Sequence, residues 1–404
     1  MKILLYLTGS ISVYKTIDLA RNLTNIGHEV KVILSESAEH FIKKEIFPYL
    51  GILEAFGPND DFSNPSKKIN HIELANWCDI FVTVPATANT ISHFNFGLTK
   101  DLGTTVYLAL PLHTPKLIFP AMNTKMLQNE IIDHNIKSLG ERKNTFIFPT
   151  DDGTLACGEV GLGKLLSVDH IETIISCWPL KISDKMVLIS TGASIAPLDD
   201  VRYLTNPASG STGFEIAKIF LQAGYKVNLI SGLYSSDIFA VLKHHPSFNL
   251  LIAKTTNDYL NLTQQLIDKS SVFISAAAIS DISFNYRPGK IKKDQLNQTI
   301  DISSSPDVLR TVLTSKKDNQ FFIGFAAEAN LDDEILRKKW VQKPVDLLIG
   351  TEVNSGTQNN EIKGFRNKTA NYKLFEKNAT FFEGSLSKKE LSTIILERVT
   401  KWLN

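Results

Sequence analysis

Four segments in the first half of the chain combine residue types that could carry chemistry. Gly9-Ser10-Ile11-Ser12 lies between an apolar run and an amphipathic segment. A glycine and hydroxyl side chains at the start of a helix can hold a phosphate, because the first backbone N–H groups of a helix have no partner within it. Such a loop can equally serve only as a helix cap, and it lacks the dinucleotide fingerprint G-x-G-x-x-G.

The other three segments offer an imidazole, an amide and a thiol. His71 could act as a general base, although a lone histidine is more often structural. Asn123 follows Pro120-Ala121-Met122 and could bind a substrate or only cap a helix. Cys157 lies in a glycine-rich stretch, residues 153–163, which is typical of a mobile flap carrying a thiol; a buried, inert cysteine is the alternative.

The second half of the chain combines lysines with small residues. Its lysines include Lys290, Lys292, Lys293, Lys338, Lys339 and Lys343. Lysine-rich stretches usually form solvated faces. Here, however, they alternate with the small-residue segments 275–278 and 324–328 and with 305–308, which can open a helix. Such loops suit a polyphosphate, because ammonium groups offset its negative charge. A P-loop is absent, so a Walker-type NTPase is excluded.

The elements that would position these residues alternate between strand-like and helix-like segments. In the first half the apolar runs are Ile3–Leu7, Val30–Leu34, Ile80–Val84, Leu117–Phe119 and Phe146–Phe148. Such runs are typical of parallel strands covered on both faces. The alternation predicts a doubly wound sheet, in which ligands bind beyond the carboxyl ends of the strands. The loops after residues 7, 34, 84 and 119 should therefore carry the chemistry.

A second array of the same kind begins after residue 185. Its apolar runs are Val187–Ile189, Val227–Ile230, Val272–Ile274, Phe321–Ile323 and Leu347–Ile349. A helix is expected from Gly213 to Ala223, and a closing helix after the capping-box pattern that begins at Ser387. The segment 177–184, which contains Pro179, is expected to be a linker. The chain is thus predicted to be α/β with two doubly wound, Rossmann-like domains, residues 1–178 and 185–404.

Composition limits the class of protein further. The 404 residues include 43 Lys and Arg against 42 Asp and Glu, so the net charge of +1 offers no electrostatic footprint for nucleic acid or an anionic membrane. No apolar run reaches the ~18–20 residues of a membrane span, and the opening run is too short for a signal peptide. The three cysteines are unclustered, which argues against disulfides or zinc. A cytoplasmic protein is expected.

Five motifs in register across residues 1 to about 175 resemble those of the flavin-containing cysteine decarboxylases, in particular the phosphopantothenoylcysteine decarboxylases. They are Gly9-Ser10-Ile11, His71-Ile72-Glu73-Leu74, Pro85-Ala86-Thr87-Ala88-Asn89-Thr90, Pro120-Ala121-Met122-Asn123 and Ala156-Cys157-Gly158. The resemblance implies a flavodoxin-like domain that binds FMN. In that family FMN oxidises the cysteine side chain to a thioaldehyde, which makes the carboxylate leave easily.

The same resemblance implies roles for single residues. His71 would be the base that assists the oxidation, Asn123 would bind the substrate carboxylate, and Cys157 would protonate the enethiol intermediate. FMN would contact Gly9, Ser10, Ile11, Ser35, Thr87 and Asn89. The family's Asn-Asp-Leu is Lys100-Asp101-Leu102 here, which changes a flavin or subunit contact. Family members form homo-oligomers with FMN at a subunit interface, so a homo-oligomer is expected.

Residues 185–404 resemble the CTP-dependent phosphopantothenate–cysteine ligases. The matching segments are Asp199–Asn206, Ser209-Gly210, Ala276–Ala278, Lys290–Lys293, Ser305–Val308 and Gly324–Glu328. In that family CTP, with Mg²⁺, activates phosphopantothenate as an acyl-cytidylate, which cysteine then attacks. Asn206 would bind the acyl-cytidylate, and Lys290 would act on the triphosphate. CTP would contact Asp281, Lys290, Ser305, Pro306, Asp307, Val308, Phe325, Lys339 and Lys343.

Two positions depart from the ligase pattern. Ala196 replaces the glutamate of a Gly-Pro-Thr-x-Glu turn, and Ser211 replaces the lysine of Ser-Ser-Gly-Lys-Met-Gly. A serine can supply a hydrogen bond there but not the positive charge.

The leading hypothesis is a bifunctional enzyme of coenzyme A biosynthesis with small-molecule substrates. The alternatives are an enzyme with only the decarboxylase half active and a flavin-binding regulatory or scaffold protein. A scaffold, however, does not need His71, Asn123 and Cys157 together. An NAD-dependent oxidoreductase is disfavoured by the missing dinucleotide fingerprint.

Overall fold

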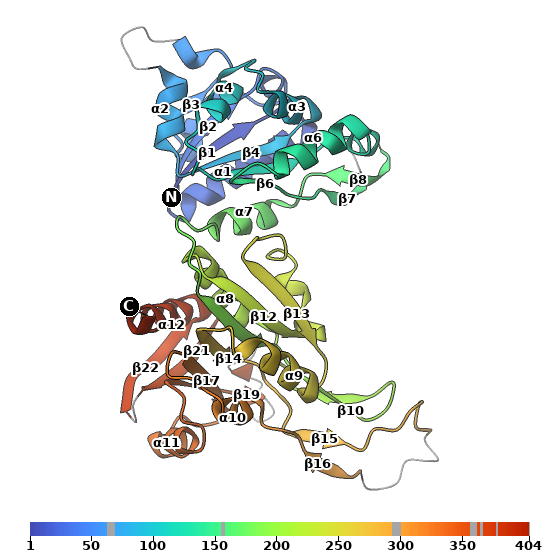
Figure 1. The fold of residues 1–404 in the computed structure, drawn as a ribbon, viewed down its shortest axis with the longest axis vertical. Helices are drawn as coiled ribbons and strands as arrows, with labels where there is room; N and C mark the ends of the chain where they lie inside the picture. Colours follow the sequence, from blue (N-terminus) through green and yellow to red (C-terminus); the bar gives the residue numbers. More distant parts are fainter. Residues whose placement is uncertain are drawn as a thin grey trace. The chain divides into compact units, whose positions relative to one another are not determined.

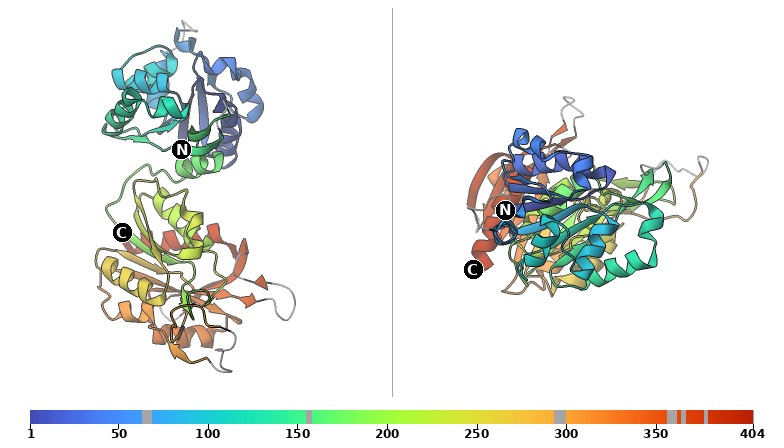
Figure 2. Two further views of the ribbon diagram at one scale, coloured as in Figure 1. Left: turned by 90° about the vertical axis from the view of Figure 1, so that its right-hand side faces the viewer. Right: turned by 90° about the horizontal axis from the view of Figure 1, so that it is seen from above.

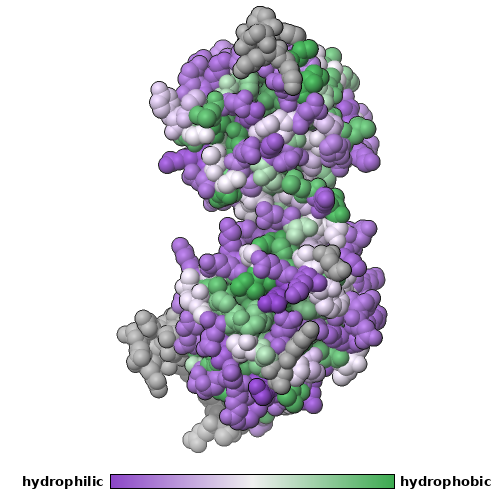
Figure 3. Space-filling model, turned by 90° about the vertical axis from the view of Figure 1, so that its left-hand side faces the viewer, coloured by the Kyte–Doolittle hydropathy of each residue, from purple (hydrophilic) through white to green (hydrophobic). Residues whose placement is uncertain are grey.

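The computed structural model describes residues 1–62, 69–154, 158–292, 300–355, 362–363, 367–376 and 379–403. The chain folds as two compact units, Met1–Ser176 and Cys177–Asn404 (Figures 1 and 2). Cys157 and Lys293 lie outside the described residues. Hydrophilic side chains cover most of the face of each unit shown in Figure 3, as expected when the apolar strand residues are buried. In the described residues, no helix is long and apolar enough to cross a membrane.

The first unit is built on a parallel sheet of six strands. In spatial order these are β3 (Ala55–Phe56), β2 (Glu29–Leu34), β1 (Lys2–Leu7), β4 (Ile80–Ala86), β5 (Lys116–Pro120) and β6 (Thr145–Ile147). The five predicted strands are confirmed. Apart from the two-residue β3, the five strands, numbered in chain order, lie in the spatial order 2-1-3-4-5. This is the flavodoxin-like arrangement that the family resemblance implies.

Helices cover this sheet and complete its core. They are α1 (Thr16–Asn25), α2 (Asn70–Trp77), α3 (Ala88–Phe96), α4 (Leu102–Ala109), α5 (Thr124–Leu127), α6 (Glu130–Gly140) and α7 (Val168–Ser176). Leu4 and Tyr6 of β1 share one buried cluster with residues of α2, α3, α4 and α6. The described residues on either side of 155–157 form an antiparallel pair of strands, β7 (Asp151–Thr154) and β8 (Val160–Lys164), which we call the hairpin. Short 3₁₀ helices span Ile11–Lys15, Ala38–His40, Lys44–Leu50 and Asp60–Phe62.

The second unit contains an eight-stranded sheet. Its order is β13 (Phe248–Ala253), β12 (Lys226–Gly232), β9 (Met186–Thr191), β14 (Val272–Ser275), β17 (Phe321–Glu328), β18 (Leu347–Glu352), β21 (Thr369–Glu376) and β22 (Ala379–Ser387). The first six strands are parallel, whereas β21 and β22 are antiparallel to their neighbours. The expected all-parallel sheet is therefore corrected to a mixed one. β18 pairs with β21 directly and antiparallel, and the residues described between them include no helix of the kind that a parallel crossover requires.

Two helical layers enclose this sheet. Along β9, Val187 and Ile189 pack in one buried cluster with α8 (Ser211–Gln222) and α12 (Lys388–Leu403). Leu188 points to the opposite face, because side chains alternate along a strand, and joins α9 (Thr256–Ile267), α10 (Val308–Leu313) and α11 (Asp333–Gln342). The remaining elements are β10 (Ile195–Pro197), β11 (Tyr203–Thr205), β15 (Ile282–Phe284), β16 (Ile302–Ser304), β19 (Asn354–Ser355), β20 (Ile362–Lys363) and the 3₁₀ helices Leu233–Ser235 and Asp237–Phe239.

A buried histidine makes the stability of the second unit depend on pH. His245 is 2% exposed, and its ring lies 5.2 Å from that of Trp178. Burial lowers the pKa of His245 to about 4, against a smaller opposing effect of the Cys177 backbone. The unfolded chain therefore binds one more proton than the folded chain between pH ~6.5 and ~4. The stability that the neutral ring contributes is complete above this window and is lost as the pH falls through it.

We expect the free energy of unfolding of the second unit to fall by up to about 3 kcal/mol from pH 7 to pH 4 on account of His245. The measurement is denaturant unfolding of the full chain across this range, followed by tryptophan fluorescence. In His245→Asn the free energy of unfolding should fall less between pH 7 and pH 4, and the difference from the wild type should be about the contribution of His245. Parallel pH profiles for the wild type and His245→Asn would contradict the assignment.

Candidate active sites

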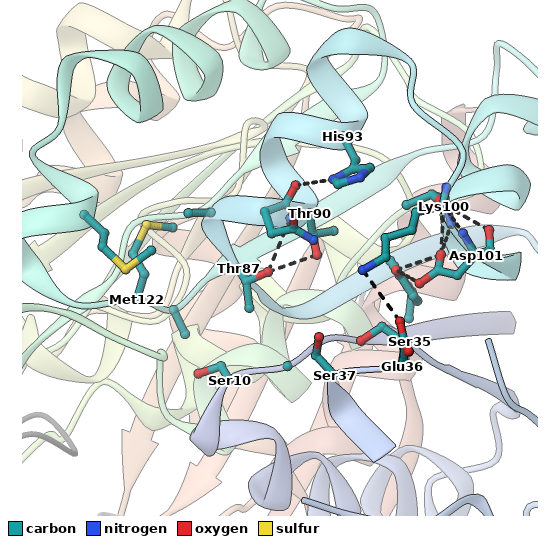
Figure 4. Close-up of a pocket in the computed structure, with 17 residues that line it drawn as sticks. Ser10, Ser35, Glu36, Ser37, Thr87, Thr90, His93, Lys100, Asp101 and Met122 are labelled. Atoms are coloured by element: carbon teal, nitrogen blue, oxygen red, sulfur yellow. Dashed lines mark hydrogen bonds and ion pairs between the residues drawn. The ribbon is translucent and has the colours of Figure 1, made fainter. Parts of the chain in front are cut away.

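The first unit has a cavity of about 430 Å³ beyond the carboxyl ends of β1, β2, β4 and β5, where the sequence placed its chemistry. Figure 4 shows Ser10, Ser35 and Ser37 on one side of it and Thr87 and Thr90 on the other. Gly9 and Asn89 also line it, whereas Ile11 lines a neighbouring cavity instead. The predicted flavin contacts other than Ile11 therefore share one hydroxyl-rich cavity.

The backbone at this cavity is suited to an anion. Thr87 caps α3, and its Oγ1 accepts a hydrogen bond from the backbone N–H of Thr90 at 3.3 Å. The hydroxyl of Thr8 joins two of the loops, because it donates to the Pro85 carbonyl at 2.6 Å and accepts from the Thr87 N–H at 3.2 Å. A fixed helix start with hydroxyls around it fits the phosphate and the polyol chain of a flavin nucleotide.

Gly9 is required by a close approach between two of these loops. A Cβ atom at Gly9 would lie 2.2 Å from the Cβ of Ser37 and 3.0 Å from its backbone carbon. Any larger residue must therefore displace a loop that lines the cavity.

Gly9→Ala is expected to lower the flavin affinity by about tenfold or more, because overpacking typically costs 1–3 kcal/mol. The flavin content of the purified protein, read from its visible absorbance, is the measurement. Gly140→Ala is the matched control, since a Cβ there meets nothing within 4 Å. Equal flavin content in both variants would remove this loop from the site.

A histidine–carboxylate pair lies at the start of α2. His71 Nδ1 is 2.7 Å and 2.9 Å from the two carboxylate oxygens of Asp61, and the His71 backbone N–H donates to the same carboxylate at 3.0 Å. Both side chains are largely buried. A carboxylate on Nδ1 favours the proton on that nitrogen and leaves Nε2 as the acceptor. His71 does not line the 430 Å³ cavity of its own chain.

Asn123 follows β5 and caps α5. Its Oδ1 accepts from the Lys125 N–H at 2.8 Å, and its Nδ2 donates to a carboxylate oxygen of Glu159 at 3.0 Å. Glu159 also pairs with the Lys125 ammonium at 2.9 Å. The amide predicted to bind a substrate carboxylate thus already holds a carboxylate from the hairpin that includes β7 and β8. Asn123 lines a cavity of about 620 Å³ that shares Ser10 with the first one.

The second unit has a cavity of about 400 Å³ at the carboxyl ends of β14, β17 and β18. Most of the predicted nucleotide contacts line it together: Asn206, Asp281, Pro306, Asp307, Val308, Phe325, Lys339 and Lys343. Asn206 is anchored by donating to the Ala278 carbonyl at 3.1 Å. The ammonium of Lys343 pairs with Asp307 at 2.6 Å, and that of Lys339 pairs with Glu328.

Ser305 and Lys290 are the two predicted contacts that do not line this cavity. The Ser305 N–H donates to the Asp281 carbonyl at 2.9 Å, next to the cavity. Lys290 is exposed on a loop after β15.

Two neighbouring carboxylates, the buried Asp199 and the exposed Asp200, hold the loop that carries Lys290. Asp199 accepts from the N–H of Ile291 at 3.1 Å, and Arg202 donates to the Ile291 carbonyl at 2.7 Å. Asp200 accepts from the N–H of Gly289 at 2.8 Å. The Arg202 guanidinium and three backbone N–H groups hold the pKa of Asp199 well below its usual range.

Sequence reasoning missed Asp61, Asp199, Asp200 and Glu159 as supporting residues. Asp199 and Asp200 belong to a segment that matched the ligase pattern, and Glu159 follows the flap cysteine by two residues. Their partners, however, could not be assigned without the fold. In the described residues, no group of three or more His, Cys, Asp or Glu side chains could hold a metal ion.

A flavodoxin-like unit with a cavity suited to a flavin, followed by a second α/β unit with a cavity of its own, fits the class of two-domain flavoproteins. Residues 1–178 match the flavoprotein family, and residues 182–403 match the C-terminal domain of the DNA/pantothenate metabolism flavoproteins.

The chain is 32% identical over 368 residues to the coenzyme A biosynthesis bifunctional protein CoaBC of Escherichia coli strain K12, covering 88% of this chain and 87% of that protein. It is 33% identical over 364 residues to the protein of the same name from Bacillus subtilis strain 168, covering 87% and 86%. A solved PPC decarboxylase variant complexed with pantothenoylaminoethenethiol is 28% identical, with a TM-score of 0.39 over 43% of this chain and 95% of that one. The chain belongs to the family of bifunctional coenzyme A biosynthesis proteins.

Proposed function

We propose that this chain catalyses two consecutive reactions, one in each unit. The second unit would join cysteine to phosphopantothenate at the expense of CTP, by way of an acyl-cytidylate. The first would decarboxylate the phosphopantothenoylcysteine so formed to phosphopantetheine, with FMN as cofactor. The observation that carries the proposal is that each unit has its own cavity at the carboxyl ends of its strands, lined by most of the residues predicted for the respective ligand.

In the decarboxylase unit, FMN would be held by Gly9, Ser35, Thr87 and Asn89 around the start of α3. Bound FMN supplies an oxidant for the cysteine side chain of the substrate. Asp61 orients His71, so that its Nε2 can accept a proton.

Asn123 would donate to the substrate carboxylate, as its amide does to Glu159. Proton donation by Cys157 stays a prediction, because this residue lies outside the described ones.

In the ligase unit, Lys339 and Lys343 would exchange their carboxylate partners for phosphate oxygens. Asn206, anchored on the Ala278 carbonyl, would hold the acyl-cytidylate in the same cavity. Mg²⁺ would enter with the triphosphate, because this ion is usually held by one or two carboxylates together with substrate phosphates. Asp281, whose side chain is exposed at the cavity, fits that role.

A homo-oligomer and a cytoplasmic location stay predictions. The position of His71 supports the first of them, since it lies off the flavin cavity of its own chain and could complete the cavity of a second copy.

The test is to incubate the flavin-loaded chain with phosphopantothenate, cysteine and CTP, and to follow pyrophosphate, CO₂ and phosphopantetheine separately. All three products should form in equal amounts. Pyrophosphate release without CO₂ would overturn the decarboxylase half. A second incubation supplies phosphopantothenoylcysteine directly. If CO₂ were released only in this second incubation, the decarboxylase half alone would be active. If neither pyrophosphate nor CO₂ were released, the result would favour a regulatory or scaffold protein.

A further inference from the structure

A lysine from the last helix reaches the position where the ligase pattern has lost its positive charge. Lys388 is the first residue of α12, and its ammonium lies 2.5 Å from the hydroxyl of Ser211, 177 residues earlier in the chain. The hydroxyl of Ser209 is 2.9 Å from that of Ser211. The next residue, Thr212, lines the 400 Å³ cavity of the ligase unit. The ammonium is therefore bound to a residue directly next to one that lines the cavity.

The charge of Lys388 is not balanced by a carboxylate, unlike that of three other lysines of this unit. Lys339, Lys343 and Lys373 each lie within ion-pair distance of a carboxylate. Within the described part of the chain, Lys388 makes no such ion pair, and its hydrogen-bond partner is a neutral hydroxyl. It is also half-buried, so that burial lowers its pKa while Glu215 only partly opposes the shift.

A half-buried ammonium held against hydroxyl groups costs free energy that an anion would offset. Phosphate is the anion that the substrates of the proposed ligase carry. Ser211, in the place of the lysine of the pattern, supplies a hydroxyl group without charge, and Lys388 brings a positive charge to the same hydroxyl from α12.

We infer that Lys388 binds a phosphate group of a ligase substrate and supplies the positive charge that Ser211 lacks. This inference rests on the proposed ligase function. Two sources of phosphate are possible, phosphopantothenate and CTP, and steady-state kinetics separate them.

The test compares Lys388→Met with the wild type, measuring pyrophosphate release while each substrate is varied in turn. Loss of one charge-assisted contact should raise the KM of the substrate that Lys388 contacts by about 10- to 100-fold, with kcat changed much less. A rise for phosphopantothenate assigns its phosphate to Lys388, and a rise for CTP assigns the triphosphate. Lys389→Met is the matched control, because Lys389 is the exposed neighbour. No rise in either KM would overturn the inference.

A rescue experiment separates phosphate binding from a structural role. Adding Ser211→Lys to Lys388→Met returns an ammonium to the loop and should restore most of the lost affinity. If the single and the double variant lost the same amount of substrate affinity and both had a lowered melting temperature, Lys388 would have a structural role and the inference would be overturned. Equilibrium binding of phosphopantothenate and of CTP to the same variants tests Lys388 independently of turnover. A wild type that releases no pyrophosphate would overturn the ligase function, whereas unaltered binding of both substrates by Lys388→Met would overturn the role of Lys388.

Discussion

His71→Asn is expected to abolish CO₂ release from supplied phosphopantothenoylcysteine while leaving the flavin bound. The imidazole is assigned to proton transfer, and removal of a positioned base typically costs about 10²- to 10⁴-fold in rate. Flavin retention is expected because the flavin would be held by other residues, which line the cavity assigned to it. Single-turnover CO₂ release and the visible absorbance of the purified variant are the two measurements.

Asp61→Asn is the companion variant, since it keeps the shape of the carboxylate that holds His71 Nδ1. An amide can donate to Nδ1 and so favour the wrong tautomer, which should lower the rate of CO₂ release while flavin content is unchanged. If either variant lost its flavin, the His71–Asp61 pair would be a structural element of the site.

Lys290→Gln is expected to abolish pyrophosphate release in the ligase reaction. The ammonium of Lys290 is assigned to the triphosphate, where its charge offsets the negative charge that develops as pyrophosphate departs. Loss of one such group typically costs about 10²- to 10³-fold in rate. CO₂ release from supplied phosphopantothenoylcysteine should be unchanged, because Lys290 belongs to the other unit. Normal pyrophosphate release by this variant would exclude Lys290 from the nucleotide site.

Asn206→Asp serves as the comparison for Lys290→Gln, because it places a negative charge in the cavity beside the expected position of the acyl-cytidylate. Activation or the attack of cysteine should be impaired while CTP still binds. Equilibrium binding of CTP distinguishes this loss from a general collapse of the site.

Buried parallel strands could be predicted from the sequence because they are continuous apolar runs. The residues of β4, for example, are buried along the whole strand. By contrast, β22 alternates between exposed and half-buried positions, so no apolar run marks it. In β21, Lys373 interrupts the apolar pattern, although it is buried and its charge is paired with Asp333 and Glu383.

Both cavities lie where ligands bind in parallel sheets, beyond the carboxyl ends of the strands. The sequence motifs supplied most of the residues that were predicted to bind there. The contacts that support those residues could not be predicted in this way. Asp61 and His71 are 10 residues apart, Asp199 and Ile291 are 92 apart, and Ser211 and Lys388 are 177 apart. Pairs so distant are set by the packing of whole elements, which a local pattern does not encode.

The contacts of Asp199, Asp200 and Arg202 with the loop that carries Lys290 also affect how tightly a nucleotide can bind. Fixing the backbone of one residue costs about 1–2 kcal/mol in conformational entropy. For Gly289 and Ile291, on either side of Lys290, this entropy is lost when the chain folds, because their N–H groups are already held. Under the proposed role of Lys290, the free energy of nucleotide binding then includes little of that cost, and only the side chain of Lys290 has to be ordered at the triphosphate.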